Sequence, residues 1–488
     1  MSFFSFIGSA LAALWRDRHY SVEQFDRLRA KRLSNLISHA RERVPFYAER
    51  FKGLDPEKFS LSDLPPVSKQ EMMAAFDQTV TDRAVTFDEV RRAAEEPGAE
   101  RARLRGKYVL SITSGTSGQV GYFLNDPNSW QSARGAVFAR TLRDRLTPYQ
   151  ISRFSFGRRY RMAFVIAGGG PYITYQLAID NPAAAALMAK VRQFSVLHPL
   201  AENVLELNRF RPHYIHGYPT YIESLAHEKL AGRIGFAPEF ISVGSEPFTP
   251  VARAALYEAF PDAIISETYG STECLTLANQ CFDGRLHVNT DYTIIEAVDE
   301  EDRPVAAGEL SHHVLVTNLT NYTQPVIRYR LTDSVVIHDK PCTCGRPLPV
   351  IEVHGRTDET IWLRDRNGIY QPHTPIPFEV LFLDVPGLIK YQLVHEWQNY
   401  LRIRFVCDPT HDGREAARNV ESNFDAYLQR HQLDDVVSMD IEVVPDISRP
   451  ERGQKLRQIF SKVPAPGRPR RERRRAKRSD SQIMRRPT

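Results

Sequence analysis

The stretch Ser111-Ile112-Thr113-Ser114-Gly115-Thr116-Ser117-Gly118-Gln119 follows a short apolar run, which predicts a loop leaving a strand. Its glycines allow the backbone to curl so that successive N–H groups point into one concavity, and its hydroxyl groups add neutral donors. This combination suits the oxygens of a polyphosphate, although a hydroxyl-rich surface turn has the same composition. The lysine of the common phosphate-binding loop is missing. The candidate binding residues are Thr113, Ser114, Gly115, Thr116, Ser117 and Gly118.

Downstream of this loop, apolar runs alternate with segments of helical pattern. The runs cover residues 161–166, 212–217, 240–243 and 263–268. Strands that alternate with helices predict an α/β fold with a largely parallel sheet, whose ligands bind beyond the carboxyl ends of the strands. Because glycine-rich segments follow three of these runs directly, we expect those segments to act together.

The composition describes an ordinary globular chain of 488 residues, 42% hydrophobic and 25% charged. The net charge of +5 is unevenly distributed along the chain. Residues 464–488 hold ten Lys/Arg and two acidic residues, a net charge of +8, so residues 1–463 carry a net charge of −3. This tail is rich in Pro and Arg, so we expect it to be disordered and solvated. Such a tail could contact nucleic acid or an anionic membrane. It has no aromatic residue to stack on bases, so we expect no binding to a specific nucleic acid.

No apolar run is long enough to cross a bilayer. The apolar start, residues 1–15, has no basic residue before its hydrophobic part and predicts a packing or surface helix rather than a signal peptide. Five cysteines in so long a chain do not make a disulfide framework, which favours a cytoplasmic location.

The pattern divides the chain into three parts. Residues 1–357 form a large domain, in which residues 291–340 change to short strands and turns. Residues 358–463 form a small α+β domain with a helix over residues 413–430, and residues 464–488 form the tail.

Three further segments accompany the loop in a fixed order, followed by a lysine near the end of the small domain. They are Tyr269-Gly270-Ser271-Thr272-Glu273, Tyr329-Arg330-Leu331-Thr332-Asp333, Gly355-Arg356-Thr357-Asp358 and Lys455. In this order and spacing they resemble the signature of the adenylate-forming (ANL) superfamily of acyl-CoA synthetases, adenylation domains and luciferases. Val44-Pro45-Phe46-Tyr47, Thr317-Asn318-Leu319-Thr320 and Cys342-Thr343-Cys344-Gly345-Arg346 resemble its phenylacetate–CoA ligase branch, which includes coenzyme F390 synthetase-like and capsule-biosynthesis-associated members.

The resemblance implies a role for each motif in binding ATP. The loop 113–118 would hold the β- and γ-phosphates, and the adenine would lie between Tyr269, followed by Gly270, and the segment Gly244-Ser245-Glu246-Pro247. Asp333 would accept both ribose hydroxyls, since a carboxylate offers only acceptors.

The resemblance also implies the catalytic residues. Thr272 would bind the α-phosphate, Glu273 would hold Mg²⁺, and Arg356 would reach a phosphate. Lys455 would be a catalytic lysine carried by a small domain that rotates about Asp358 between two half-reactions. Taken singly, each of these residues is equally compatible with an ordinary surface or capping role. The sequence departs from the family pattern at Gln119, Thr332 and Glu359, in place of a lysine, a glycine and an aspartate.

Cys281-x5-His287 and Cys342-x-Cys344 could supply four ligands to a structural Zn²⁺, although free buried thiols are the alternative. By family analogy the acyl pocket would use His216, Tyr218 and Tyr172, unless these side chains only pack in the core.

The expected activity is ATP- and Mg²⁺-dependent ligation of a small carboxylic acid, aromatic by the resemblance, to coenzyme A through an acyl-adenylate. A first alternative keeps the adenylate but passes it to an amine, a carrier protein or a sugar, or releases an adenylylated product. A second is a non-catalytic nucleotide-binding scaffold. A homodimer is compatible with the sequence.

Overall fold

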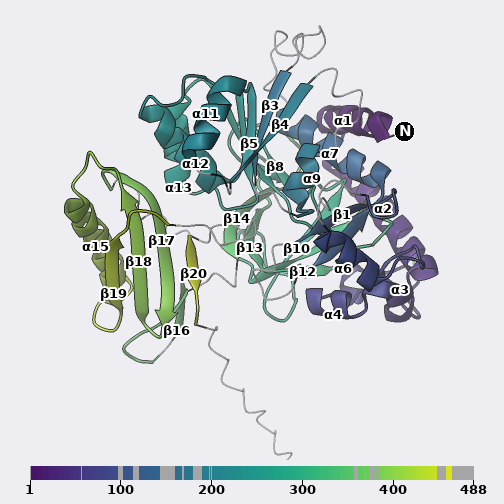
Figure 1. The fold of residues 1–488 in the computed structure, drawn as a ribbon. Coiled ribbons are helices and arrows are strands. Elements are labelled where there is room, and N and C mark those ends of the chain that lie inside the picture. Colours follow the sequence, from purple (N-terminus) through teal and green to yellow (C-terminus); the bar gives the residue numbers. More distant parts are fainter. Residues whose placement is uncertain are drawn as a thin grey trace, which may run out of the picture.

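The computed structural model describes the chain in segments. These are residues 2–55, 58–96, 103–113, 120–142, 160–166, 170–179, 189–196, 198, 200–356, 361–368, 370–373, 378, 381–382, 385–447 and 458–463. Figure 1 shows a helical N-terminal region and a central sheet on one side and a separate sheet-and-helix unit, formed by the C-terminal residues, on the other.

Helices open the chain. They are α1 (Ser2–His19), α2 (Val22–Arg43), α3 (Pro45–Arg50), the 3₁₀ turn Leu61–Asp63, α4 (Lys69–Ala74), α5 (Phe76–Thr79) and α6 (Phe87–Glu95). Helix α2 begins at a capping box between Ser21 and Gln24 and ends at Val44, whose extended backbone follows from the proline after it. Pro45 then occupies the first turn of α3, where its missing N–H costs nothing.

A nine-stranded sheet forms the centre of the molecule. Its order is β13-β14-β9-β8-β7-β6-β5-β3-β4. The strands are β3 (Tyr160–Ile166), β4 (Ala189–Ser195), β5 (Tyr214–Gly217), β6 (Phe240–Gly244), β7 (Ile264–Tyr269), β8 (Ala278–Gln280), β9 (Leu286–Val288), β13 (Asp333–His338) and β14 (Val350–Arg356). The run from β4 to β7 is parallel, as the alternation of strands and helices predicts, and β8, β9, β14 and β13 continue it antiparallel.

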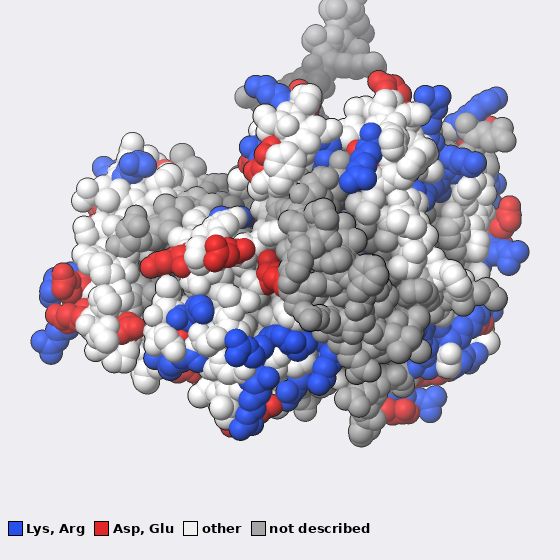
Figure 2. Space-filling view, turned by 90° about the horizontal axis from the view of Figure 1, so that it is seen from above, with Lys and Arg blue, Asp and Glu red and all other residues white. Residues whose placement is uncertain are grey.

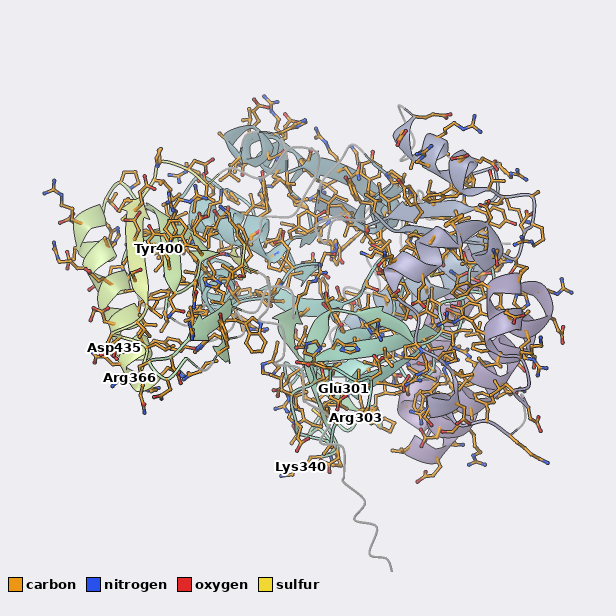
Figure 3. All side chains as sticks on the ribbon, turned by 90° about the horizontal axis from the view of Figure 1, so that it is seen from below. Glu301, Arg303, Lys340, Arg366, Tyr400 and Asp435 are labelled. Carbon is orange, nitrogen blue, oxygen red and sulfur yellow. The ribbon has the colours of Figure 1, made fainter. Side chains whose placement is uncertain are left out.

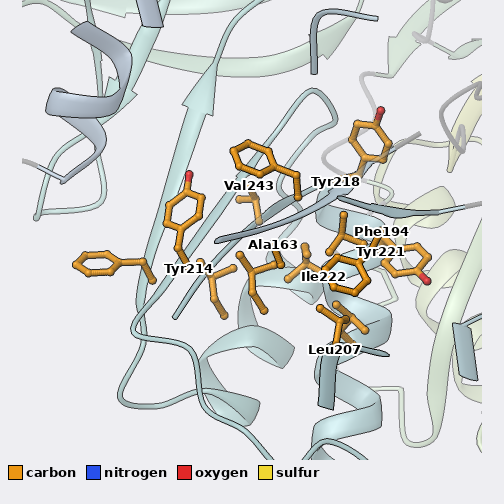
Figure 4. Close-up of a cluster of buried hydrophobic side chains, with 14 of the residues drawn as sticks. Ala163, Phe194, Leu207, Tyr214, Tyr218, Tyr221, Ile222 and Val243 are labelled. Carbon is orange, nitrogen blue, oxygen red and sulfur yellow. The ribbon is translucent and has the colours of Figure 1, made fainter. Parts of the chain in front are cut away.

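Helices cover the parallel part of this sheet. They are α7 (Pro127–Leu142), α9 (Ile173–Ile179), α11 (Leu200–Phe210), α12 (Pro219–Leu230) and α13 (Pro250–Ala259). Figure 4 shows the core between sheet and helices, where side chains of β5 and β6 meet those of α11 and α12. Tyr214, Tyr218 and Tyr221 bring hydroxyl groups into this mainly apolar cluster.

Two smaller sheets flank the central one. The hairpin β1 (Val109–Ile112) and β2 (Tyr122–Asn125) is antiparallel, so the strand predicted before the hydroxyl-rich loop lies outside the large sheet. The antiparallel sheet of β10 (Thr293–Val298), β11 (His313–Asn318) and β12 (Tyr329–Leu331) confirms the predicted β-rich region.

The C-terminal unit has its own core. A four-stranded sheet runs in the order β19-β18-β17-β20, beside the pair β15 (Ile361–Arg364) and β16 (Tyr370–His373). Its strands are β17 (Leu388–Trp397), β18 (Tyr400–Cys407), β19 (Ser438–Val443) and β20 (Ile459–Ser461). Helix α15 (Gly413–Arg430) has the predicted bounds and buries one face, formed by Ala416, Val420, Phe424 and Leu428. Arg366 and Asp435 of this unit form a 3.4 Å ion pair. Figure 3 labels both residues, well apart from Glu301 and Arg303 near β10.

Within the described segments, no helix has the length and apolar character needed to span a membrane. On the face that Figure 2 shows, basic and acidic side chains are interspersed among the described residues.

Candidate active site

The base of the hydroxyl-rich loop is held by two hydrogen bonds between Thr113 and Gly121. The Thr113 amide donates to the Gly121 carbonyl at 2.9 Å, and the Thr113 hydroxyl accepts from the Gly121 amide at 2.8 Å. The loop therefore closes the β1–β2 hairpin. Its first residue already uses its hydroxyl oxygen as an acceptor inside the protein.

This hairpin base contacts the segment that carries Tyr172. The Ile112 amide donates to the Pro171 carbonyl at 3.0 Å, and Ile112 and Tyr172 form a parallel bridge. The hydroxyl oxygens of Thr174 and Tyr218 lie 3.2 Å apart. The base of the hairpin thus contacts Tyr172, and Thr174, two residues further on, contacts Tyr218.

The carboxyl ends of β5, β6 and β7 lie next to one another in the parallel part of the sheet. Thr220, just beyond β5, donates its hydroxyl to the Glu246 carboxylate beyond β6 at 2.6 Å. Gly244, which ends β6, approaches β7 so closely that a Cβ there would lie 2.8 Å from the Thr268 carbonyl oxygen. Only glycine fits at this position. Ser245 follows with a φ of +70°, a backbone conformation that stores strain at functional sites.

Tyr269, at the end of β7, contacts the predicted ribose-binding residue. Its hydroxyl donates a 2.7 Å hydrogen bond to Asp333 Oδ2, although the two residues are 64 positions apart. Burial raises the pKa of the Tyr269 hydroxyl well above its usual range, and the nearby Asp333 and Glu273 carboxylates raise it further. Two predicted motifs therefore meet at this hydrogen bond.

The turn after β7 presents Thr272 and Glu273. The Ser271 amide donates to the Cys274 carbonyl at 2.9 Å, which closes the turn tightly. Gly270 is required beside it, because a Cβ would lie 2.7 Å from the Leu275 carbonyl oxygen. Thr272 is half-buried, whereas Glu273 is buried and its backbone carbonyl accepts a 3.2 Å hydrogen bond from the Asn318 side chain.

The Tyr329 hydroxyl, which sequence reasoning missed, also belongs to the surroundings of Glu273. Burial raises the pKa of this hydroxyl, and the Glu273 carboxylate beside it raises it further. Tyr329 sits four residues before Asp333, so its place in the motif was the only signal in the sequence.

Arg356 lies directly opposite Asp333 in the antiparallel pair of β13 and β14. Its Nε donates a 2.9 Å hydrogen bond to the Thr332 hydroxyl. Thr332 is one of the departures from the family pattern, and a glycine could not make this contact. The substitution thus adds an anchor for the guanidinium.

His216 is buried at the end of β5, with its Nδ1 3.2 Å from the Ser242 hydroxyl. Burial lowers its pKa to about 4, so the imidazole is neutral at pH 7. The Phe164 ring lies 5.5 Å from it, centroid to centroid. His216 thus lies beside an aromatic ring and a hydroxyl group.

The four predicted zinc ligands converge. One ligand atom from each of Cys281, His287, Cys342 and Cys344 lies within 4.8 Å of every other. Cys281 Sγ is 3.9 Å from Cys342 Sγ, and Cys344 Sγ is 3.3 Å from His287 Nε2. In a tetrahedral site with Zn–S bonds of about 2.3 Å, two ligand atoms lie about 3.8 Å apart. The two measured separations are close to that value.

The imidazole of this cluster is oriented for coordination. His287 Nδ1 lies 2.8 Å from the Leu348 carbonyl oxygen, to which only a protonated nitrogen can donate. Nε2 therefore turns its lone pair toward the sulfur atoms, the arrangement typical of histidine ligands. The donor set fits Zn²⁺. Cys274 is not among these ligands: its thiol lies 3.6 Å from the hydroxyls of Thr276 and Thr293.

Some predicted site residues lie outside the described residues. They are Ser114, Gly115, Thr116, Ser117, Gly118, Asp358 and Lys455. Their roles stay predictions, as do the tail and the hinge between residues 1–357 and 358–463.

No protein-family model matches the chain. In sequence it is 29% identical over 392 residues to a phenylacetate–coenzyme A ligase of Thermus thermophilus, covering 76% of this chain and 78% of the relative. It is 21% identical over 372 residues to Protein CapK of Staphylococcus aureus, covering 72% and 73%. In structure it matches a 2-hydroxyisobutyryl-CoA ligase in complex with 2-HIB-AMP, with a TM-score of 0.66, 19% identity and coverage of 89% and 88%. The chain is therefore similar in sequence to phenylacetate–coenzyme A ligases and shares the fold of 2-hydroxyisobutyryl-CoA ligase.

Proposed function

We propose that this protein is an AMP-forming acid–thiol ligase that joins a small carboxylic acid, aromatic or of similar size, to coenzyme A. In the first half-reaction a carboxylate oxygen attacks the α-phosphorus of ATP and pyrophosphate leaves. In the second, the thiol of coenzyme A attacks the acyl carbon, loses its proton, and AMP leaves. The observation that supports this proposal is the contact of Tyr269 with Asp333, which brings two separate motifs together with Glu273 nearby.

The residues would divide the work between binding and charge neutralisation. Asp333 offers only acceptors and would take the ribose hydroxyls in place of the Tyr269 hydroxyl. Arg356, anchored on Thr332, would reach a phosphate oxygen. Since substrate and ATP are both anionic, positioning and neutralisation account for most of the rate enhancement in such chemistry.

Glu273 and Thr272 would face the metal and the α-phosphate respectively. A buried carboxylate is a suitable oxygen ligand for Mg²⁺, which when bound neutralises phosphate charge. Tyr329, packed against Glu273, would keep that carboxylate in place.

The acyl group would lie among His216, Tyr218 and Tyr172. His216 is neutral at pH 7, so it would accompany an uncharged acyl chain or ring rather than form an ion pair. This favours recognition of the acid by shape and aromatic contact, with the carboxylate directed toward the nucleotide.

Zn²⁺ at Cys281, His287, Cys342 and Cys344 would be structural, because all four tetrahedral positions are taken by protein atoms. It would tie the β8–β9 hairpin to the segment before β14. In the same proposal the domain of residues 358–463 rotates about Asp358 and brings Lys455 to the site for adenylation only.

Pyrophosphate release with a panel of carboxylic acids tests the activity, assayed with and without coenzyme A. Acid-dependent release followed by thioester formation is the expected result. Release with no dependence on coenzyme A would instead indicate another acceptor. Nucleotide binding without release for any acid, by folded protein, would indicate the scaffold alternative.

A further inference from the structure

Helix α1 presents an apolar face to solvent. Its side chains Phe4, Ile7, Leu11 and Trp15 are 79%, 37%, 63% and 55% exposed, and their spacing places them along one side of the helix. No charged residue occurs in residues 2–15. A surface helix normally turns polar residues outward, so this face needs an explanation.

The opposite face of α1 is fixed to the protein. Gly135 of α7 lets the two helices approach so closely that a Cβ there would lie 2.2 Å from the Phe6 carbonyl oxygen. The Ser9 hydroxyl donates to the Ser132 carbonyl at 2.7 Å, and Arg16 pairs with the buried Asp291 at 2.8 Å. The helix cannot rotate to bury its apolar face without breaking these contacts.

The N-terminal segment that contains α1 is rich in basic residues. Residues 1–50 contain nine Lys/Arg and five Asp/Glu, a net +4, and residues 464–488 carry +8. Since the whole chain carries +5, residues 51–463 carry −7. The basic charge is therefore concentrated in the segment that contains α1 and in the tail.

The exposed area favours a membrane over a second copy of the chain. Four large side chains at these exposures present on the order of 400 Å² of apolar surface, about half of what one partner gives to an interface of standard size. A bilayer surface needs no complementary partner patch. Aromatic and aliphatic side chains along one helix face suit the boundary of headgroups and acyl chains, and basic residues in the same segment of the chain suit anionic headgroups.

We propose that α1 docks this protein on anionic membrane surfaces, with Phe4, Ile7, Leu11 and Trp15 entering the interface and the basic tail strengthening attachment. Figure 1 places α1 at the periphery of the molecule, with the N-terminus at its outer end. The apolar face of α1 and the basic tail together would give reversible attachment, because neither is sufficient alone. The proposal concerns where the protein acts and does not depend on its proposed activity.

Co-sedimentation of the full chain with vesicles tests this, using phosphatidylcholine alone and a 70:30 mixture with phosphatidylglycerol. We expect binding to the anionic vesicles, weakened at least tenfold by the double substitution Leu11→Glu and Trp15→Glu. The matched control is Leu205→Glu on α11, where Leu205 is 53% exposed, and it should bind within twofold of the unmodified protein. Deletion of residues 464–488 should weaken binding and reduce its salt dependence.

Trp15 gives a readout that does not disturb the face. Brominated lipids should quench the fluorescence of the unmodified protein, and Trp15→Phe should bind equally while losing most of the quenching. The proposal is overturned if anionic vesicles are not bound, if the double variant binds as tightly as the unmodified protein, or if it only converts a dimer to a monomer.

Discussion

The Tyr269 hydroxyl donates a 2.7 Å hydrogen bond to Asp333 Oδ2, so the acceptor predicted for ribose already binds a group of the protein. The contact spans 64 positions and joins the end of β7 to the start of β13 at the far edge of the sheet. It positions the carboxylate beside the end of β7.

Replacing Asp333 by Asn should raise KM for ATP ten- to a hundredfold, because a hydrogen bond to a charged acceptor contributes about 1.5–3 kcal/mol. Tyr269→Phe keeps the ring and frees the carboxylate, so it should change KM for ATP by no more than threefold. Steady-state kinetics with varied ATP distinguishes the two. An equal loss in both variants would contradict ribose binding by Asp333.

The Thr332 hydroxyl should matter through Arg356. Thr332→Val removes the acceptor at nearly constant volume and should lower kcat five- to tenfold, about 1–1.4 kcal/mol. Thr332→Ser keeps the acceptor and should retain most of the activity. If valine and serine behave alike, the 2.9 Å contact has no role in the reaction.

Removing the Cys/His ligands should destabilise the protein. We expect one zinc per chain by elemental analysis, and a melting temperature lowered by several degrees in Cys344→Ser or after chelation. Cys407→Ser is the control, since Cys407 is not one of the four clustered ligands. Full stability and no zinc in the unmodified protein would contradict the site.

Acid should destabilise the fold through His216. Its pKa is about 4 in the fold and about 6.5 in the unfolded chain, so the unfolded state takes up the proton first. The contribution of His216 to the free energy of unfolding is constant above pH 6.5 and decreases as the pH falls toward 4. At pH 5 the decrease is about 2 kcal/mol. Urea unfolding at pH 7 and pH 5 should show a smaller drop in His216→Phe than in the unmodified protein. Equal drops would contradict the assigned pKa.

The buried ion network under α1 should be costly to break. Arg140 is fully buried and pairs with Asp17 at 2.7 Å and Asp291 at 2.8 Å. Arg140→Ala leaves both carboxylates without this partner and should cost about 3–5 kcal/mol in the free energy of unfolding. The exposed pair of Arg91 and Asp88 provides the control, and Arg91→Ala should cost less than 1 kcal/mol. Denaturant titration measures both.

Local sequence pattern was sufficient for most of the secondary structure. The helix over residues 413–430 and the end of α2 before Pro45 follow from periodicity and from the backbone restriction that proline imposes, which act within a few residues. One local interpretation was incomplete: β1, predicted as a strand, pairs with β2 and forms an isolated bridge to Tyr172, and it is not a strand of the nine-stranded sheet. Strand pairing depends on distant residues, so a strand's own sequence does not specify its neighbour.

The residue types at the candidate site, and their order along the chain, were readable from the motifs because phosphate, ribose and metal chemistry restricts which side chains can serve. Folding alone brought Tyr269 to Asp333, Thr332 to Arg356 and four ligand atoms within 4.8 Å, and turned the apolar side of α1 outward. Such contacts join residues far apart in the chain, and their geometry arises only when complete layers pack together. Periodicity can show that a helix has two faces, but the rest of the molecule decides which one meets water.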